Sequence, residues 1–381
     1  MARWLADHGQ AVRVVTAPPY YPDWKVWPQF GGWRYATASE GGVDVLRCPL
    51  YVPAQPTALK RLLHLASFSL SSSVAMLAQL RWKPELVVLV LVVPTLFCAP
   101  QALLLAKLAG AKSVLHVQDY EVDALFGLSI AKGGRLKRFA YAMKRALLRG
   151  FDRVSTISRG MLERARPKGV AEDKLRFFPN WSETARFRDV ARSAELLRTL
   201  GVDPDKRVLL YSGNIGQKQG LETVIEAAER LQQRDDLVFL IVGEGAGKRG
   251  LVEMAERKAL RNVRFAPLQP YEGLPVLLAS ADCHLVIQKR GAADAVLPSK
   301  LTNILAVGGN AVITADADTT LGRLCAEHPG IAVRAEPESV TALIEGIERC
   351  LAMPRFNDVA TAYAGEFLDK DRILERFLAE L

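Results

Sequence analysis

The sequence predicts an α/β protein built from two doubly wound domains. Apolar runs of strand length alternate with helical stretches, which is the pattern of parallel sheets with crossover helices. The clearest runs are VRVVTA, LVVLVLVV, KSVLHVQ, RVSTIS, RVLLYSG, LVFLIVG, VRFAPL, CHLVIQ and NAVITA. With 381 residues, 50% of them hydrophobic, the chain is too long for one ordinary core and has enough apolar material for two.

A break in this pattern marks the expected domain boundary near residue 186. Pro179 and Asn180 interrupt the alternation, and a charged helical stretch then leads to the strand RVLLYSG. A helical tail at the end of the chain is expected to cross back onto the first domain. The predicted parts are a first domain over 1–186, a second domain over 187–357 and the tail over 358–381.

The first domain is expected to lack its first strand. The helix end ARWLADHGQ runs directly into the strand AVRVVTA. In a doubly wound domain such a helix normally follows a first strand and a glycine-rich turn. We therefore expect an incomplete sheet in this domain.

The cysteines and the N-terminus indicate a cytoplasmic protein. No pair of cysteines forms a C-x-x-C motif or lies near histidines at the spacing of metal ligands. The N-terminal residues lack the apolar core of a signal peptide. We therefore expect buried thiols and no metal or other cofactor. The five cysteines are Cys48, Cys98, Cys283, Cys325 and Cys350.

Residues 86–106 carry no charge over a length that would span a membrane. Pro94 and Pro100 divide this stretch, and its first part is rich in β-branched residues. We expect a buried parallel strand over 86–93 and a short helix over 101–109.

The net charge of +9 is distributed unevenly. Residues 1–185 carry 25 Lys and Arg against 13 Asp and Glu, a net +12, and residues 186–381 carry a net −3. The densest basic segment is 132–150, and 59–83 is basic at both ends. These segments are either solvated helix faces or peripheral contacts with anionic lipid, to which each nearby cation contributes about 1 kcal/mol. No nucleic-acid-binding signature is present, so no nucleic-acid partner is expected.

The segment RVLLYSGNIGQKQGLETVIEAAERL has the pattern of an anion site. A strand is followed by a loop containing Gly213, Gly216 and Gly220, and then by an amphipathic helix. Glycines let the backbone approach a phosphate closely, and a helix N-terminus offers free N–H groups. Lys218 adds a full positive charge, which favours anion binding over an ordinary tight turn.

A second turn, LPSKLTNILAVGGNAVITA, offers a matching helix start. Pro298 and Ser299 are typical of a helix N-terminus, and Lys300 in the first turn opposes the helix dipole. An anion bound at the helix end explains this cation, with Ser299 and backbone N–H groups as donors. Asn303 is spaced to hydrogen-bond a ribose. We expect the two turns to converge on one pyrophosphate.

Three weaker patterns are interpreted as structural. GAGKRG at 245–250 matches a dinucleotide-binding pattern, but it follows a late strand and lacks an acid at the next strand end. Asp316 and Asp318 have the spacing of a metal–diphosphate site. Asp203 and Asp205 share that spacing. Both pairs fall in expected surface loops, where solvated or capping roles are favoured.

In the first half, the segment HVQDYEVDA follows a predicted strand. His116, Asp119 and Tyr120 therefore lie near the carboxyl end of a parallel strand, where open α/β sheets bind ligands. His116 is either a satisfied core histidine or a residue of the cleft. Asp119 is the stronger candidate, because three acids in five residues at a strand end are poor core material.

The loop TAPPYYPDWKVWPQFGGW is rich in aromatic residues and prolines. Tyr20, Tyr21 and Trp24 are its first three aromatic residues. Aromatic faces of this kind stack on sugar rings, and they also cover cores as a lid. Both interpretations stay open.

Together these motifs resemble the retaining glycosyltransferases of family four, which have the GT-B fold of two Rossmann-like domains facing a cleft. The resemblance rests on TAPPYYPDWKV, RCPLYVPAQPT, HVQDYEVDA, RVSTISR, FFPNWSE, SGNIGQKQGLE and LPSKLTNILAVGGNAVITA, which span nearly the whole chain. It implies a cytoplasmic enzyme at the inner membrane that moves a sugar, with GDP-fucose as donor, onto a polyprenyl-diphosphate-linked saccharide during exopolysaccharide (colanic acid) synthesis.

The resemblance also implies roles for individual residues. It assigns catalysis to Asp119, Lys218 and Lys300, donor binding to Gly213, Asn214, Gly216, Gly243, Leu268, Pro298, Ser299 and Asn303, and acceptor binding to Tyr20, Tyr21, Trp24, His116 and Tyr120. Asn303 falls where many relatives carry the second glutamate of an E-x7-E motif. Asn214 stands where an arginine is common, so fewer cations stabilise the diphosphate. Two alternatives stay open: a nucleotide-sugar epimerase of the same architecture, and a non-catalytic interaction subunit.

Overall fold

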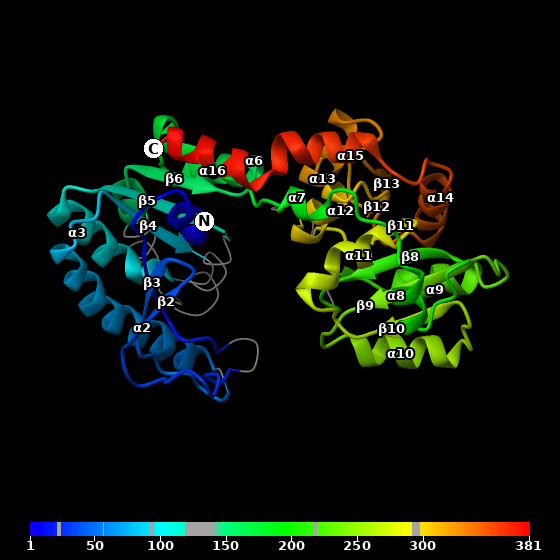
Figure 1. Cartoon of the computed structure of the whole chain (residues 1–381), viewed down its shortest axis with the longest axis horizontal. Coiled ribbons are helices and arrows are strands. Elements are labelled where there is room, and N and C mark those ends of the chain that lie inside the picture. The colour runs from blue at the N-terminus through cyan, green and yellow to red at the C-terminus, as the bar shows by residue number, and fades with distance from the viewer. Residues whose placement is uncertain are drawn as a thin grey trace. The chain divides into compact units, whose positions relative to one another are not determined.

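The computed structural model describes residues 1–20, 24–55, 57–91, 95–118, 142, 145–216, 219–291 and 298–381. The chain forms two compact units, each with its own sheets and helices (Figure 1). The N-terminal unit comprises Met1–Phe178 and Phe377–Leu381, and the C-terminal unit comprises Pro179–Arg376. The first segment of the N-terminal unit ends at Phe178, whose N–H donates to the carbonyl of Thr156 at 2.9 Å.

The N-terminal unit contains two sheets. The first has the order β1-β3-β2, and the second has the order β4-β5-β6-β7 with all neighbours parallel. The strands are β1 Arg13–Thr16, β2 Ala36–Glu40, β3 Val43–Arg47, β4 Leu86–Leu91, β5 Lys112–Val117, β6 Arg153–Thr156 and β7 Leu175–Phe177. The helices are α1 Ala2–Asp7, α2 Ala58–Ala78, η1 Gln79–Arg81, η2 Thr95–Cys98, α3 Ala99–Ala109, α6 Arg159–Ala165, η3 Arg166–Lys168 and η4 Glu172–Lys174.

The two sheets of this unit end on unpaired edges. Among the described strands, β1 pairs only with β3 and β4 pairs only with β5.

The uncharged stretch after residue 86 is a strand, as predicted. β4 pairs in parallel with β5 from Leu86 to Leu91, and the chain then forms α3 with Pro100 in its first turn. Proline is tolerated there because the first N–H groups of a helix have no partner within the helix.

The C-terminal unit is built on one parallel sheet of order β10-β9-β8-β11-β12-β13. Its strands are β8 Arg207–Ser212, β9 Leu237–Val242, β10 Val263–Ala266, β11 Cys283–Val286, β12 Ala311–Thr314 and β13 Val333–Ala335. Its helices are α7 Thr184–Phe187, α8 Ala194–Thr199, α9 Glu222–Arg230, α10 Lys248–Arg257, η6 Tyr271–Gly273, α11 Leu274–Ala279, α12 Ser299–Ala306, α13 Thr320–Glu327, α14 Val340–Leu351, α15 Asp358–Tyr363, the π-helix η7 Ala364–Leu368 and α16 Lys370–Ala379. Two hydrophobic clusters cover the two faces, since every side chain of β9 is buried and alternate ones enter opposite clusters.

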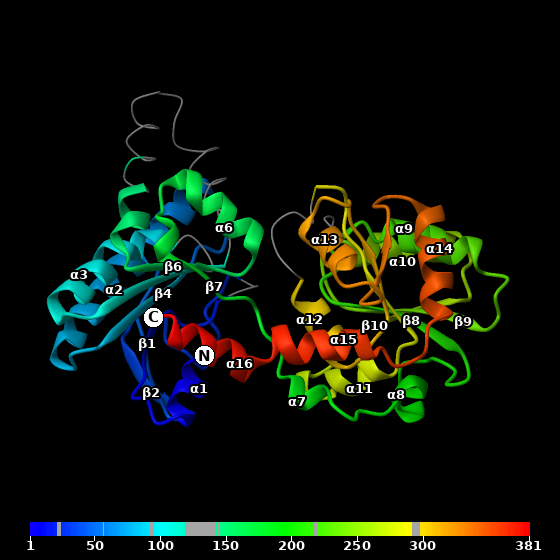
Figure 2. The same cartoon turned by 90° about the horizontal axis from the view of Figure 1, so that it is seen from above.

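The predicted tail is the run of α15, η7 and α16, which Figure 2 shows from above. Most of it belongs to the C-terminal unit, and only its last five residues, from Phe377 onward, group with the N-terminal unit. There the Phe377 ring stacks on Phe178 with centroids 3.9 Å apart. Lys112 also donates to the carbonyl of Leu381 at 2.7 Å. These contacts fix the end of the chain.

Candidate functional site

The sheet of the C-terminal unit changes direction between β8 and β11. The chain proceeds outward from β8 through β9 to β10, and then returns to β11 on the other side of β8. Open α/β sheets bind ligands at this switch point, outside the carboxyl ends of the strands. The two turns predicted as an anion site follow these two strands. The sheet order therefore brings together segments that are about 80 residues apart in the sequence.

The glycine loop after β8 is held by backbone bonds to the turn after β9. Gly213 has φ +143°, a conformation that L side chains rarely adopt, and its N–H donates to the Val242 carbonyl at 3.0 Å. The Ile215 N–H donates to the Glu244 carbonyl at 2.8 Å. The Tyr211 hydroxyl donates to the Asn214 carbonyl at 2.6 Å. These bonds fix residues 213–215 at the start of the loop.

The second glycine cluster supports the first. A Cβ on Gly243 would lie 2.0 Å from the Gly213 carbonyl oxygen, and one on Gly245 would lie 2.3 Å from that of Ile215. Gly247 donates its N–H to the same Ile215 carbonyl at 2.9 Å. GAGKRG therefore packs against the loop after β8, which explains Gly245 and Gly247 without a dinucleotide. Gly243, which the sequence predicted to bind the donor, lies against Gly213 in the structure.

Lys300 lies beside this loop. Its Cδ is 3.9 Å from the position of a Cβ on Gly213, and its Nζ lies 4.2 Å from the centre of the Tyr211 ring. The side chain is only partly exposed, and Lys300 makes no ion pair with any residue that the structure describes. Desolvation lowers the pKa of Lys300 to about 8. A half-buried cation of this kind is suited to an anionic ligand.

The helix after β11 begins where the sequence predicts. Pro298 precedes α12, which starts at the exposed Ser299, and no described side chain caps its N-terminus. An uncapped helix start offers N–H groups to an anion. Asn303 accepts a hydrogen bond from the Ser182 hydroxyl at 2.8 Å, so its oxygen is already occupied within this unit. The predicted contact of Asn303 with a ribose would therefore use its amide nitrogen, and it stays a prediction.

Lys289 is a cation near the loop that the sequence did not single out. Gly220 has φ +67°, and a Cβ placed there would lie 2.9 Å from the Lys289 Cγ. Lys289 follows the carboxyl end of β11, so the switch point places it against the glycine loop. In the sequence it is one of two neighbouring cations after a strand, a pattern typical of an ordinary surface. Leu268, predicted on the donor side, is 55% exposed after the carboxyl end of β10.

His116 is a satisfied core histidine, the first of the two alternatives. It is 3% exposed, and its Nδ1 lies 2.9 Å from the Ser155 hydroxyl while its Nε2 accepts from Gln118 at 2.6 Å. Burial lowers the pKa of His116 to about 4, so the ring is neutral at neutral pH. Since both ring nitrogens are bonded to protein groups, the structure does not support its predicted contact with the acceptor.

Tyr20 and Trp24 pack around His64 of α2. The ring of Tyr20 meets that of His64 edge-on at 4.8 Å, and the ring of Trp24 lies 5.6 Å from His64. The Arg61 guanidinium lies 5.6 Å from the centre of the Trp24 ring. These contacts favour a lid over α2, and sugar stacking stays a prediction. The predicted site residues Tyr21, Asp119, Tyr120 and Lys218 lie outside the described residues, as does most of the basic segment 132–150.

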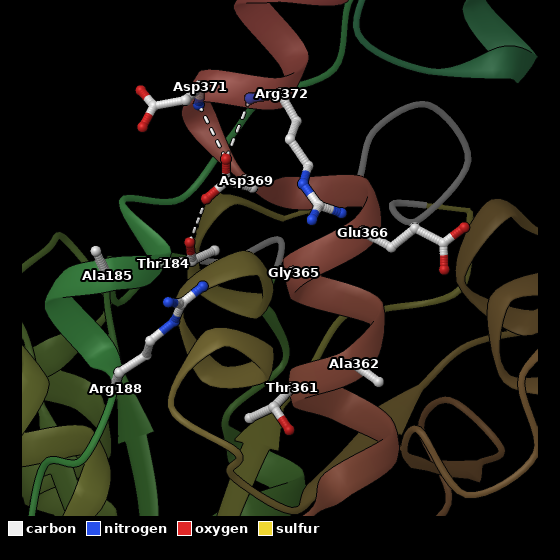
Figure 3. Close-up of a pocket in the computed structure, with 10 residues that line it drawn as sticks. All are labelled: Thr184, Ala185, Arg188, Thr361, Ala362, Gly365, Glu366, Asp369, Asp371 and Arg372. Atoms are coloured by element: carbon white, nitrogen blue, oxygen red, sulfur yellow. Dashed lines mark hydrogen bonds between the residues drawn. The ribbon is translucent and has the colours of Figure 1, made fainter.

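A pocket of about 710 Å³ lies elsewhere in the C-terminal unit, between α7 and the tail (Figure 3). Asp369 at its edge accepts from the Thr184 hydroxyl and from the N–H groups of Asp371 and Arg372. The carboxylate therefore caps the start of α16. None of the predicted site residues lines this pocket.

The two aspartate pairs have structural roles. Asp316 pairs with Arg290 at 2.6 Å, and Asp203 accepts from the N–H of Asp205 at 3.0 Å. Within the described ranges, no group of three or more His, Cys, Asp or Glu side chains is arranged to hold a metal ion. The interpretation of both pairs as ion-paired or turn-forming residues agrees with these contacts.

Comparisons with known proteins cover both units. A glycosyl transferase 4-like domain matches residues 1–181, and a glycosyl transferases group 1 domain matches residues 193–366. WcaI of Escherichia coli strain K12, which is named as a glycosyl transferase of colanic acid biosynthesis, is 57% identical over 386 residues, covering 100% of this chain and 94% of that protein.

Solved structures resemble the whole chain. Sucrose-phosphate synthase from Thermosynechococcus elongatus has a TM-score of 0.70 at 16% identity and covers 99% of this chain and 90% of its own. HepE from Anabaena, solved in complex with UDP, has a TM-score of 0.62 at 17% identity and covers 89% of this chain and 86% of its own. At these identities the likeness concerns the fold.

Proposed function

We propose that this chain, which belongs to the glycosyltransferases with a glycosyl transferase 4-like domain followed by a group 1 domain, transfers fucose from GDP-fucose. The proposed acceptor is a polyprenyl-diphosphate-linked saccharide in colanic acid synthesis. The predicted family and the predicted GT-B fold of two Rossmann-like domains are confirmed. The relation to WcaI supports the pathway, while the sugar, the base and the lipid carrier belong to the proposal.

One observation carries the proposal: Lys300 lies partly desolvated beside Gly213 at the switch point of the C-terminal sheet. A cation without a carboxylate partner among the described residues, next to a glycine turn and an uncapped helix start, fits the diphosphate of a nucleotide sugar. The complex of HepE with UDP, a protein of the same fold, agrees with nucleotide binding.

The proposed reaction needs electrostatic stabilisation more than a strong base. The bond between the anomeric carbon and the diphosphate breaks, and its electron pair leaves with GDP. The acceptor hydroxyl forms a new bond to the same face of the sugar, so that the anomeric configuration is retained, and its proton passes to the leaving phosphate. Lys300 and the first-turn N–H groups of α12 stabilise the charge that develops on the diphosphate. Asp119 would orient the sugar or the acceptor.

The proposal includes neither a metal ion nor another cofactor, because cations of the chain act on the diphosphate. It places the enzyme in the cytoplasm, at the inner face of the membrane where the lipid-linked acceptor lies. Adding EDTA should leave turnover unchanged. A loss of turnover that Mg²⁺ restores would contradict this part of the proposal.

The donor is tested by titrating the full chain with GDP, UDP and ADP in a calorimeter. GDP should bind most tightly, and GDP-fucose should then be consumed only when a lipid-linked acceptor is present. Epimerisation of the donor without acceptor would favour an epimerase. Binding without any turnover would favour a non-catalytic subunit. A clear preference for UDP or ADP would reject the proposed donor.

Nucleotide affinity should depend on pH through Lys300. At neutral pH the ammonium is protonated, and above its pKa of about 8 it loses the proton that an anionic ligand needs. The dissociation constant for GDP should therefore rise with pH above 8, by up to about tenfold per pH unit. Calorimetry on both sides of pH 8 measures this. Lys300→Ala should flatten the profile, whereas Lys258→Ala, which removes a lysine paired with Glu229, should keep it. A profile that Lys300→Ala leaves unchanged would assign the titration to another group.

A further inference from the structure

The polar and apolar faces of helix α2 have an unusual orientation. At the surface of a soluble domain a helix normally buries its apolar stripe and exposes polar side chains. In α2, a long helix on the outside of the N-terminal unit (Figure 1), the inward face includes buried polar residues and the outward face carries leucines. This reversed orientation needs a physical reason.

The inward face of α2 is fixed by hydrogen bonds. His64 and Ser72 are 4% and 0% exposed. The His64 ring donates from Nδ1 to the Tyr51 carbonyl at 2.5 Å. The Ser71 hydroxyl donates to the Pro49 carbonyl at 2.6 Å. These bonds attach the helix to the unit along its polar side, so its orientation is not free to reverse.

The outward face is a continuous apolar stripe. Its members follow one another at intervals of four, seven, four and three residues, which keeps them on one side of a helix of 3.6 residues per turn. The α2 stripe consists of Leu59, Leu63, Leu70, Val74 and Leu77, exposed by 68%, 52%, 73%, 62% and 44%. Isolated exposed leucines are ordinary, but an aligned row of this length marks an interaction surface.

The charges around the stripe indicate its partner. Lys60 and Arg61 stand at the start of α2, Arg81 and Lys83 follow its end, and residues 57–84 contain no Asp or Glu. An anionic lipid surface matches cations at both ends of an apolar stripe. A second copy of the same stripe would bring like charges together in either orientation, which disfavours self-association.

The helix is also long enough to cross a membrane. Leu59–Arg81 has a mean hydropathy of 1.3 and is the one helix among the described residues that passes this criterion by length and composition. Crossing would require the inward hydrogen bonds to break and would place the serines in hydrocarbon. A helix attached along one side and apolar along the other fits the plane of the membrane interface instead.

We propose that the α2 stripe docks this chain in the plane of an anionic bilayer, with the leucines at the acyl boundary and the four cations among the headgroups. The purpose of this docking, access to a lipid-linked acceptor, rests on the proposed function. The surface itself follows from the orientation of α2 and from the charges that flank it.

The test is sedimentation of the full chain with vesicles of phosphatidylcholine alone and of phosphatidylcholine mixed with phosphatidylglycerol. The unmodified chain should bind the anionic vesicles more tightly. The triple variant Leu63→Glu, Leu70→Glu and Val74→Glu should bind them about 100-fold more weakly, because apolar burial is lost at three positions. The double variant Lys60→Gln and Arg81→Gln should bind anionic vesicles about 25-fold more weakly, at about fivefold per cation, and should bind neutral vesicles almost as the unmodified chain does.

A control places a single glutamate at an exposed apolar position outside the stripe. Val359 on α15 is 43% exposed in the C-terminal unit, so Val359→Glu should bind vesicles like the unmodified chain. Circular dichroism and melting should show that each variant is folded. Undiminished binding by the triple variant, or no binding by the unmodified chain, would overturn the proposal. The proposal would also be overturned if the unmodified chain formed a dimer without lipid and the triple variant were a monomer in the ultracentrifuge.

The two proposals can fail separately. The triple variant should keep the GDP affinity of the unmodified chain, since the stripe lies in the other unit from the glycine loop. Vesicle binding that depends on the stripe, in a protein that binds no nucleotide, would reject the proposed function and keep the membrane surface. Conversely, the protein could bind nucleotide and turn over while the stripe substitutions leave vesicle binding unchanged. That result would reject the membrane surface and keep the proposed function.

Discussion

Replacing Lys300 by alanine should lower turnover by about 10²–10³-fold, the range for losing one group that stabilises a developing anion. The ammonium of Lys300 lies over the Tyr211 ring and beside Gly213, and it is partly withdrawn from water. An electrostatic contact is stronger in such a site than in water, and it costs little rearrangement during the reaction. Turnover with a saturating donor and acceptor measures the effect.

The stability of Lys300 variants distinguishes a role in turnover from a purely structural role. Burial lowers the pKa of Lys300, so its charged form opposes folding below pH 8, and stability rises as the pH rises from about 8 toward the ordinary lysine value. Lys300→Met should therefore fold at least as stably as the original at pH 7 while losing turnover. Lys258→Ala, which breaks a partly exposed pair with Glu229, should leave turnover unchanged. Lys300→Met with a lower melting temperature and normal turnover would show that the lysine is structural.

Gly243→Ala should disrupt the site without touching a ligand. The new Cβ would lie 2.0 Å from the Gly213 carbonyl oxygen, a backbone atom that cannot rotate away, so the loop after β8 must move. Overpacking of this kind costs about 1–3 kcal/mol, which lowers the melting temperature by about 2–12 °C in a domain of this size. The displaced loop should also weaken GDP binding, and a displacement near 1 Å should lower turnover by about 100-fold.

Gly250→Ala is the matched control for this substitution. Gly250 lies in α10, a few residues along the same segment, and a Cβ there meets nothing within 4 Å. Alanine is the better helix former, so this variant should be slightly more stable and bind GDP normally. If Gly243→Ala behaved like Gly250→Ala, the contact between the two glycine turns would not hold the loop.

Local patterns were sufficient to predict the parallel strands and both turns of the candidate site. The strand before Gly213 and the start of α12 at Ser299 depend on residues within a few positions of each other, and these elements form where the sequence indicates. β4 was also distinguished from a membrane span by local signals, since Pro94 and its β-branched residues favour a strand.

Contacts between distant segments could not be predicted in this way. Gly245 and Gly247 of GAGKRG are explained only when β9 lies next to β8, because the neighbours of these two glycines are Asn214 and Ile215. His116 carried two interpretations until Ser155 of the next strand was in place. The basic residues at both ends of 59–83 indicated a helix face that is solvated or contacts lipid, but only the bonds of His64 and Ser71 show which side faces the unit.

The return of the chain to its first unit affects the order of assembly during translation. Phe178 is made before any of the C-terminal unit, but its stacking partner, Phe377, leaves the ribosome only after that unit has been synthesised. Domains commonly fold one by one as they emerge. Here the half of the protein that is made first completes its packing last, and until then it exposes the surface that Phe377 will cover.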